Sequence, residues 1–501
     1  MKYISTRGGE PVSAANAIVQ GISPTGGLYV PETFPAMDLS KLYTLYSESN
    51  KATGSGYLAV ADAVMGPYLS DTSAEKRMDM LNKAYARFDT PKVAPLTFLT
   101  EHESVVELWH GPTMAFKDVA LQMLPHLLKN ALVITGVEDE IYILVATSGD
   151  TGKAALEGFA GVEGARVLVF YPDGGVSKAQ RLQMVTQEGP NVDVCAVEGN
   201  FDDAQTGVKK IFADPAIKDK LKALGCRLSS ANSINFGRLL PQIVYYFTSY
   251  FALIDQGRIQ LGDKVNFCVP TGNFGDILAG EYARRMGLPV HKLICASNRN
   301  NVLTDFFNTG TYDDKRPFYK SMSCSIDILI SSNLERLLFE LADRNPKQVQ
   351  EWMESLKQTG LYAIGEKARA SLSEVFAAGW CNEEDTLHTI KRVYDAHGYL
   401  MDPHTAVAQT VYERYVAESG DNTQTVVLST ANPYKFASDV LSVFETPTGD
   451  DFQNADRLYE ITGAPVPKGI SGLKDKPERF HDVCSLSAMP DRVVTPVKKA
   501  R

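Results

Sequence analysis

The stretch Val265-Asn266-Phe267-Cys268-Val269-Pro270-Thr271-Gly272-Asn273-Phe274-Gly275-Asp276 begins as an apolar strand, continues as a glycine-rich loop and leads into a helical pattern over Ile277–Met286. Gly272 and Gly275 permit close approach to the backbone, and the amide N–H groups ahead of the helix suit a phosphate. A glycine-rich turn needed only for tight packing is the alternative. The order of strand, loop and helix is the unit from which parallel sheets are built.

Short apolar segments alternate with helical segments from about Lys92 onward. This alternation is typical of a parallel sheet with helices on both faces, so we expect an α/β fold. The predicted strands are Val133–Ile134, Ile141–Ala146, Ala165–Tyr171, Val192–Val197, Val265–Val269, Lys292–Ala296 and Thr425–Ser429.

Three other regions lack this alternation. Residues 1–95 are predicted to form a mainly helical N-terminal domain, with helical periods over Val12–Gly21 and Tyr57–Tyr68. Residues from about 300 to 400 resemble a helical insertion, and residues 446–501 resemble a wrapping tail.

Lys117 lies among apolar residues and is the candidate reactive amine. Its neighbours are Trp109, Met114, Ala115, Phe116, Val119 and Leu121. Desolvation by such neighbours lowers the pKa of a lysine toward the range where the free amine attacks a carbonyl. A solvated lysine whose stem crosses apolar surface is the alternative.

A second junction follows the strand at Ile143–Ala146 and reads Thr147-Ser148-Gly149-Asp150-Thr151-Gly152 before a helix over Lys153–Phe159. Small hydroxyl residues and glycines at the start of a helix suit an anion such as a carboxylate. The loop matches neither the Walker A pattern nor G-x-G-x-x-G. A capped, purely structural turn is equally compatible with it.

Two further segments offer polar groups. Thr430 follows the strand Thr425–Ser429, where a hydroxyl could meet a ring nitrogen or could simply cap a helix predicted over Tyr434–Val443. The segment Ser230–Gln242 gathers Asn232, Ser233 and Arg238, which suits a phosphate because arginine makes bidentate contacts with it. An N-capped helix with an ordinary arginine is the alternative.

A desolvated lysine, a phosphate loop, a second anion site and a carboxylate loop together indicate pyridoxal 5'-phosphate acting on a phosphorylated amino acid. In this interpretation the lysine forms a Schiff base and the cofactor ring stores electrons.

Composition and spacing argue against several other classes. The 60 acidic and 50 basic residues give a formal net charge of −10 without a basic block, so nucleic acid is not an expected partner. The most apolar run, Leu239–Ile254, is broken by Pro241 and Gln242, so we expect a buried helix and no membrane span, which needs roughly 20 apolar residues.

The N-terminal sequence and the spacing of cysteine and histidine residues bear on the compartment of the protein and on metal binding. The start of the chain lacks the apolar core of a signal peptide, and seven scattered cysteines without a C-x-x-C pair indicate reduced thiols, so we expect a cytoplasmic protein. We expect no metal site, because His102 and His110 are not in H-E-x-x-H spacing and His404 lacks a second ligand at helical spacing.

The chain resembles the threonine synthases, of the longer bacterial and fungal type, within the tryptophan-synthase-β-like (fold type II) group of pyridoxal phosphate enzymes. Seven segments carry the resemblance: Lys2–Arg7, Gly26–Pro31, His110–Asp118, Thr147–Gly152, Ser230–Gln242, Gly272–Asp276 and Asp402–Ala408. It implies two open, twisted, mostly parallel sheets with helices on both faces. A large cofactor-binding domain would comprise residues 96–130 plus 236–445, and a small domain residues 131–235.

The resemblance also implies roles for individual residues. Lys117 would bind the cofactor covalently, and Thr430 would face its ring nitrogen while Asp150 lies near its phenolic oxygen. The residues implied to hold the cofactor phosphate are Gly272, Asn273, Phe274, Gly275 and Asp276. Those implied to bind the substrate carboxylate are Thr147, Ser148, Gly149 and Thr151, and those implied to bind its phosphate are Asn232, Ser233 and Arg238.

The implied reaction converts O-phospho-L-homoserine and water to L-threonine and phosphate. A phospholyase that releases 2-oxobutyrate, ammonia and phosphate shares the early steps, and a catalytically silent relative is a further alternative. Many relatives have histidine where this chain has Asn432, so we give Asn432 no catalytic role. The sequence leaves the choice between a monomer and a homodimer open.

Overall fold

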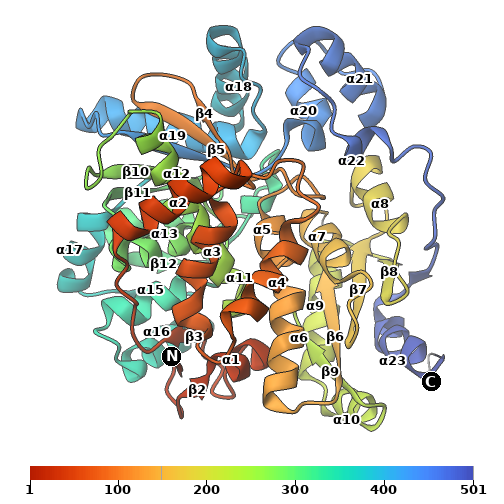
Figure 1. The fold of residues 1–501 in the computed structure, drawn as a ribbon. Helices are drawn as coiled ribbons and strands as arrows, with labels where there is room; N and C mark the ends of the chain where they lie inside the picture. The colour runs from red at the N-terminus through yellow and green to blue at the C-terminus, as the bar shows by residue number, and fades with distance from the viewer. Residues whose placement is uncertain (148, 500–501) are drawn as a thin grey trace.

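The computed structural model describes residues 1–147 and 149–499, and these fold around two mostly parallel sheets, as Figure 1 shows. The larger sheet has the strand order β14-β11-β10-β15-β5-β4, and only β4 runs antiparallel to its neighbour. The smaller sheet has the order β16-β8-β7-β6-β9 and is parallel throughout. The predicted α/β class is therefore confirmed.

The strands of the two sheets are β4 (Leu96–Phe98), β5 (Glu103–Glu107), β6 (Glu140–Ala146), β7 (Ala165–Pro172), β8 (Val192–Val197), β9 (Cys226–Ser229), β10 (Val265–Pro270), β11 (Val290–Ser297), β14 (Phe376–Trp380), β15 (Thr425–Ser429) and β16 (Val483–Cys484).

The helices that follow the N-terminal region are α5 (Lys117–Leu121), α6 (Leu124–Thr135), α7 (Asp150–Phe159), α8 (Lys178–Val185), α9 (Phe201–Ala213), α10 (Pro215–Ala223), α11 (Phe236–Leu239), α12 (Ile243–Asp255), α13 (Gly275–Arg285), α14 (Val302–Thr309), α15 (Leu334–Leu341), α16 (Pro346–Thr359), α17 (Glu366–Val375), α18 (Glu383–His397), α19 (Pro403–Ser419), α20 (Ala437–Leu441), α21 (Asp451–Thr462), α22 (Lys468–Ser471) and α23 (Met489–Lys499). Short 3-10 helices are η2 (Leu240–Gln242), η3 (Cys324–Ile326), η4 (Pro433–Phe436) and η5 (Leu486–Ala488).

The N-terminal region combines helices with a small sheet. Its antiparallel strands β1 (Lys2–Ser5), β2 (Val12–Ser13) and β3 (Tyr29–Pro31) have the order β2-β1-β3. Its helices are α1 (Ala14–Gln20), α2 (Leu39–Thr53), α3 (Tyr57–Met65), η1 (Gly66–Leu69) and α4 (Ala74–Tyr85). The N-terminal region packs against helices that follow it in the chain, because α1 contacts α6 and α3 contacts α12.

Six of the seven predicted strands are present, and the prediction at Val133–Ile134 is wrong. These two residues end α6, whose buried face is formed by leucines and an alanine at helical spacing: Leu124, Leu127, Leu128, Ala131 and Leu132. Val133 is 77% exposed, so the apolar pair lies on the outer face of a helix and not in a sheet.

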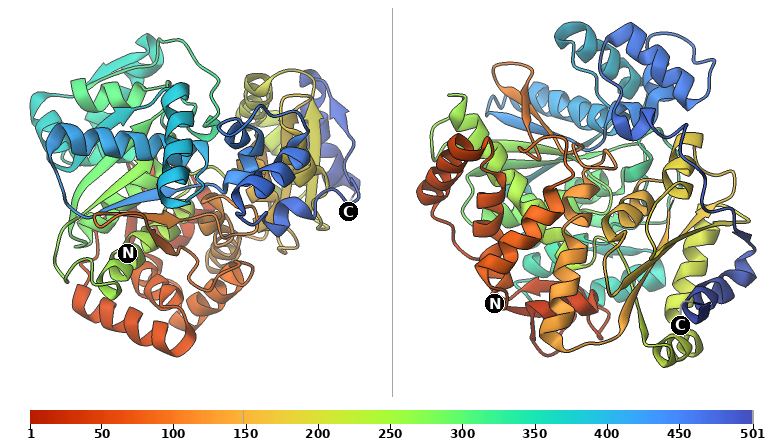
Figure 2. Two further views of the ribbon diagram at one scale, coloured as in Figure 1. Left: turned by 90° about the horizontal axis from the view of Figure 1, so that it is seen from above. Right: turned by 45° about the vertical axis from the view of Figure 1, so that its right-hand side comes forward.

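The region between residues 300 and 400 is not purely helical. It contains the antiparallel pair β12 (Thr311–Asp313) and β13 (Leu361–Ala363), and it supplies β14, the edge strand of the larger sheet. The tail runs from α21 across to the smaller sheet, where β16 pairs with β8 and α23 packs against α10, as the blue chain on the right of Figure 2 shows. The predicted domain limits remain predictions.

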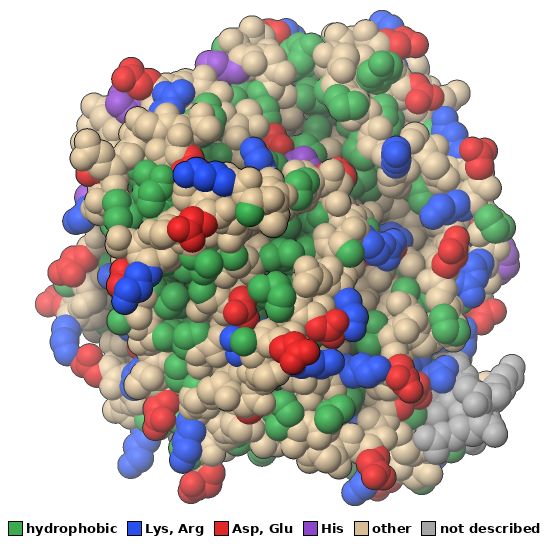
Figure 3. Space-filling view, in the orientation of Figure 1, with side chains coloured by type: hydrophobic (Ala, Val, Ile, Leu, Met, Phe, Trp, Pro, Cys, Tyr) green, Lys and Arg blue, Asp and Glu red, His purple; other side chains and the backbone are tan. Residues whose placement is uncertain are grey.

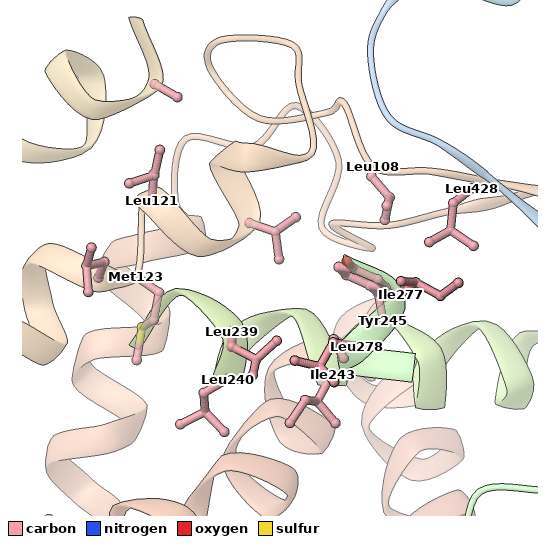
Figure 4. Close-up of a cluster of buried hydrophobic side chains, with 14 of the residues drawn as sticks. Leu108, Leu121, Met123, Leu239, Leu240, Ile243, Tyr245, Ile277, Leu278 and Leu428 are labelled. Carbon is pink, nitrogen blue, oxygen red and sulfur yellow. The ribbon is translucent and has the colours of Figure 1, made fainter. Parts of the chain in front are cut away.

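Buried apolar side chains connect the sheets to the helices beside them. Figure 4 shows Leu108 and Leu428, at the ends of β5 and β15, beside Tyr245 of α12 and Ile277 of α13. On the face in Figure 3, acidic and basic side chains are interspersed. Within the described residues, no helix has the length and apolar character needed to cross a membrane.

Helices α5 and α7 cross at Gly158, and this crossing sets the position of the segment that begins with Lys117. A Cβ atom at Gly158 would lie 2.1 Å from the carbonyl oxygen of Leu121 and 2.9 Å from its carbonyl carbon. Because these are backbone atoms, an added methyl group would have to push the two helices apart.

We predict that Gly158→Ala lowers the free energy of unfolding by about 3 kcal/mol, the upper part of the range for overpacked sites. Gly365→Ala is the control, because a Cβ there meets no atom within 4 Å. This control substitution should lower the free energy of unfolding by about 1 kcal/mol or less. Urea unfolding of both variants measures the difference, and equal losses would contradict the close crossing.

Candidate active site

The predicted site residues lie in loops that follow the carboxyl ends of parallel strands in both sheets. Lys117 follows β5 of the larger sheet, and Asp150 follows β6 of the smaller one. The Nζ atom of Lys117 lies 3.9 Å from Oδ2 of Asp150. The two sheets therefore contribute charged groups to one site, where open parallel sheets bind ligands.

Lys117 begins α5, and its side chain is 11% exposed. Its Nζ atom donates to Oγ of Ser325 at 3.3 Å and lies 5.2 Å from the centre of the Phe116 ring. Burial lowers the pKa of Lys117, and the charges of Lys435 and Arg238 lower it further, while Asp150 acts in the opposite direction. The Lys117 side chain is therefore largely buried, and its role as the reactive amine stays a prediction.

Lys435, in η4, was not predicted as a site residue, yet it is the main partner of Asp150. Its side chain is 1% exposed, and its Nζ atom lies 2.9 Å from Oδ1 of Asp150. It also donates to the carbonyl oxygen of Thr113 at 2.8 Å. Burial alone would raise the pKa of Asp150, but Lys435 and Lys117 more than offset this and hold it well below its usual range.

Ser325 and His404 are also site residues that sequence reasoning missed. Ser325 Oγ lies between Lys117 and Asp150, donating to Oδ2 of Asp150 at 3.4 Å. The Ser325 N–H donates to Nε2 of His404 at 3.0 Å, and Nδ1 of His404 lies 2.6 Å from Oδ2 of Asp402. Asp402 caps α19, and the pattern Asp402-Pro403 was the available signal for this position.

The glycine-rich loop after β10 leaves the start of α13 open. Its cap residue, Phe274, makes no side-chain capping hydrogen bond and has a φ of 65°, held by packing against Phe307 and Phe376. A Cβ at Gly272 would approach the Cα of Ile326 to 3.0 Å. The first N–H groups of α13, at Gly275 and beyond, are thus available to an anion.

Asp276 lies in this loop, but its side chain faces the core. Tyr245 donates to Oδ1 of Asp276 at 2.5 Å, and Tyr246 donates to the same atom at 3.1 Å. Burial raises the pKa of Asp276 to about 7. Only the backbone N–H of Asp276 can contribute to an anion site at the start of α13.

The loop after β6 has a similar open helix start. The hydroxyl of Thr147 accepts hydrogen bonds from the N–H groups of Gly149 and Gly152, both at 3.0 Å. Gly149 has a φ of 147°, which only glycine adopts without strain, and it makes no side-chain cap for α7. Thr151 is in the first turn of α7, whereas Ser148 lies outside the described residues.

Arg238 is a buried cation that pairs with no carboxylate among residues 1–147 and 149–499. Its Nη1 atom donates to the carbonyl oxygen of Ala231 at 2.7 Å, while its buried Nε atom has no hydrogen-bond partner among the described residues. Burial lowers the pKa of Arg238 to about 10. The neighbouring Asn232 is exposed, and Ser233 donates to Oδ1 of Asn232 at 3.3 Å. An unpaired buried guanidinium beside an exposed polar loop fits an anionic ligand.

Thr430 directly follows β15 and is 6% exposed, and its carbonyl oxygen accepts the N–H of Phe116 at 2.8 Å. This contact places Thr430 beside the segment that carries Lys117. Asn432 has a structural role, because its Oδ1 atom accepts the N–H of Tyr434 at 3.0 Å and caps η4.

Three family models match the chain. The model described as "Threonine synthase N terminus" matches residues 2–85, "Pyridoxal-phosphate dependent enzyme" matches residues 105–431, and "Threonine synthase, C-terminal" matches residues 405–493. The first and last cover the N-terminal region and the tail, for which the sequence offered no chemistry.

Relatives and solved structures agree with these matches. The threonine synthase of Pseudomonas aeruginosa is 41% identical over 441 residues, covering 87% of this chain and 89% of that protein. Human threonine synthase-like 1 is 39% identical over 443 residues, covering 86% of this chain and 58% of that protein, so the chain spans under two thirds of its length. The crystal structure of threonine synthase from Brucella melitensis, described as bound to pyridoxal phosphate, is 36% identical with a TM-score of 0.87, covering 99% of both chains.

The buried position of Asp276 leads to a pH-dependent prediction. Its pKa is raised from 3.8 to about 7, so the folded state keeps a proton that the unfolded state loses, and stability falls as pH rises from about 4 to 7. Asp276→Asn retains the acceptor for both tyrosines and does not ionise. The free energy of unfolding of the variant, minus that of the native protein, should therefore rise by as much as about 4 kcal/mol as the pH increases from about 4 to 7. Urea unfolding of the apoprotein at several pH values measures this, and a difference independent of pH would refute it.

The contact between Lys435 and Asp150 leads to a second prediction. Lys435→Met should lower the free energy of unfolding by about 3–5 kcal/mol, because among the described residues it leaves the buried carboxylate of Asp150 with the more distant Lys117 as its remaining ion-pair partner. Combining Lys435→Met with Asp150→Asn removes the negative charge of residue 150 and should recover part of the lost free energy of unfolding. If the losses of the two single variants simply add in the double variant, the ion pair does not stabilise the site.

Proposed function

Because this chain belongs to the threonine synthase family of pyridoxal-phosphate-dependent enzymes, we propose that it converts O-phospho-L-homoserine and water to L-threonine and phosphate, as a carbon–oxygen lyase acting on phosphates. One observation carries the choice of substrate. Arg238 is a buried guanidinium whose Nε atom has no hydrogen-bond partner in the described part of the chain, beside the polar loop of Asn232 and Ser233. Such a group fits a phosphate that is bound and then released.

The residues present fit the cofactor. The uncapped start of α13, with Gly272, Asn273 and Gly275, would hold its phosphate, and Lys117 would hold its aldehyde. Thr430, at the end of β15, would face the ring nitrogen, and Asp150 the phenolic oxygen. When bound, pyridoxal phosphate supplies an electron sink beside the amino group of the substrate.

Lys117 would transfer the protons of the reaction. Because burial lowers its pKa, more of the free amine is present near neutral pH than for a solvated lysine, and a free amine can remove a proton from a carbon atom. The contacts of its Nζ atom with Ser325 and Asp150 orient the amine and provide acceptors for the ammonium form. We expect Lys117 to transfer protons at both Cα and Cβ of the substrate.

Two anion sites would orient the substrate. The start of α7, with Thr147, Gly149 and Thr151, would receive the α-carboxylate, and Ser148 belongs to the same loop in the sequence. Arg238, with Asn232 and Ser233, would bind the phosphate and stabilise it as the leaving group. Water would then add at Cβ.

The compartment is part of the proposal. The seven cysteines are scattered along the chain without a C-x-x-C pair, and most are buried, which supports a reducing environment such as the cytoplasm.

The test is a product assay on the purified holoenzyme with O-phospho-L-homoserine. Threonine and phosphate should form in equal amounts, and Lys117→Ala should abolish both products together with the visible absorbance of the bound cofactor. Formation of 2-oxobutyrate and ammonia in place of threonine would identify a phospholyase. A colourless protein without turnover would identify a silent relative.

A further inference from the structure

Arg336 is a second buried cation near the substrate-phosphate loop, and neither the sequence pattern nor the proposed reaction assigns it a role. It lies in α15 and is completely buried. Its acceptors among the described residues are all neutral oxygens: the carbonyls of Tyr29 and Ile234 and Oδ1 of Asn333. A buried guanidinium whose hydrogen bonds go to neutral oxygens is costly, so its position calls for an explanation.

The contacts of Arg336 lead directly to the loop that would bind the substrate phosphate. Its Nη2 atom donates to the carbonyl oxygen of Ile234 at 2.5 Å, next to Ser233 in the chain. Its Nη1 atom donates to Oδ1 of Asn333, which leaves the Nδ2 atom of Asn333 facing the other way. The guanidinium therefore determines which side of the Asn333 amide is presented to the loops.

Asn333 joins the two loops that would bind phosphates. Its Nδ2 atom donates to Oγ of Ser233 at 2.9 Å and to the carbonyl oxygen of Asn273, also at 2.9 Å. The N–H of Asn333 donates to the same carbonyl oxygen of Asn273 at 3.1 Å. One amide thus fixes the distance between the substrate-phosphate loop and the cofactor-phosphate loop.

The N-terminal segment holds the start of α15 in place. Arg336 Nε donates to the carbonyl oxygen of Tyr29 in β3 at 2.9 Å. The adjacent Glu335 accepts from Thr6 at 2.5 Å and pairs with Arg7, whose Nη2 atom lies 2.7 Å from Oε2. In Figure 1, α15 lies beside the strands of this segment.

We propose that Arg336 is a positioning residue that orients Asn333, and that Asn333 in turn holds Ser233 and Asn273 at the spacing needed to bind substrate phosphate beside cofactor phosphate. The proposal rests on the proposed function. It also gives the N-terminal segment a role beyond covering the core, because Tyr29, Thr6 and Arg7 contact the first turn of α15, which carries Arg336 and directly follows Asn333.

The test is a double-mutant cycle on the holoenzyme with inorganic phosphate as the probe. Arg336→Met, Asn333→Leu and the double variant are titrated with phosphate by calorimetry, and KM and kcat for O-phospho-L-homoserine are measured. Each single variant should weaken phosphate binding about 10-fold and raise KM by a similar factor. The value of kcat should stay within about 3-fold of the native value, because the lost contacts bind the substrate and the transition state equally. If Arg336 acts through Asn333, the double variant should be no weaker than the singles.

Arg344→Met is the matched control. Arg344 follows the same helix and donates to the carbonyl oxygens of Glu32 and Pro31, but its side chain bonds to neither phosphate loop. It should change phosphate binding by less than about 2-fold, within the range of an ordinary surface substitution. If Arg336→Met does not fold, Arg336→Lys replaces it in the cycle, because lysine keeps the charge but cannot reach three acceptors at once.

Two results would overturn the proposal: unchanged phosphate binding in the single variants, or losses that multiply to about 100-fold in the double variant, which is the result for independent sites. The proposed function is tested separately by the product. If the effects of the two substitutions on phosphate binding are independent but the native enzyme forms threonine, only the positioning role is refuted. If the two effects depend on each other but no threonine is formed, only the proposed reaction is refuted.

Discussion

The Asp150 carboxylate is shared by two buried ammonium groups, and the arrangement of the two sheets depends on this contact. Lys117 follows β5, Asp150 follows β6 and Lys435 follows β15, so the charges meet only if the carboxyl ends of both sheets face each other. Burying any one of these charges alone would cost several kcal/mol. Burial, together with the nearby charges of Lys435 and Arg238, keeps the Lys117 amine easier to deprotonate than a solvated lysine, although Asp150 acts in the opposite direction.

The remaining site groups follow the same physical logic. Arg238 is buried with an Nε atom that has no hydrogen-bond partner among the described residues, and the cap residue of α13 makes no side-chain hydrogen bond. Each feature is unfavourable in an isolated protein and becomes favourable when an anion binds. The molecule thus has positive potential where a cofactor phosphate, a substrate carboxylate and a substrate phosphate would lie, although its formal net charge is −10.

The sequence predicted the local units well and the long-range contacts poorly. Strands such as Val192–Val197 and Thr425–Ser429 were placed correctly because a buried parallel strand is a continuous apolar run between turn signals. Val133–Ile134 failed because the same kind of run can end a helix on its exposed face. The strand β14 was missed because it lies at the edge of the sheet, within a region rich in polar helices.

Among site residues, those in glycine-rich loops could be found because the backbone geometry demands particular residues. Lys435, Ser325 and Asn333 could not, since their function depends on partners far away in the chain and their types are common on surfaces. Asp276 lies in a predicted loop, yet its side chain faces two tyrosines of α12, which no local pattern indicates.

The most direct measurement of the central claim is the ionisation of Lys117 itself. Reductive methylation of the apoprotein across a pH series, quantified for the peptide that contains Lys117, reports the fraction of free amine at each pH. We expect its midpoint to lie below the ordinary lysine value of roughly 10.4, because burial and two neighbouring cations disfavour the ammonium form. A midpoint at or above that value would show that Asp150 dominates, and would contradict the account of Lys117 as a desolvated, reactive amine.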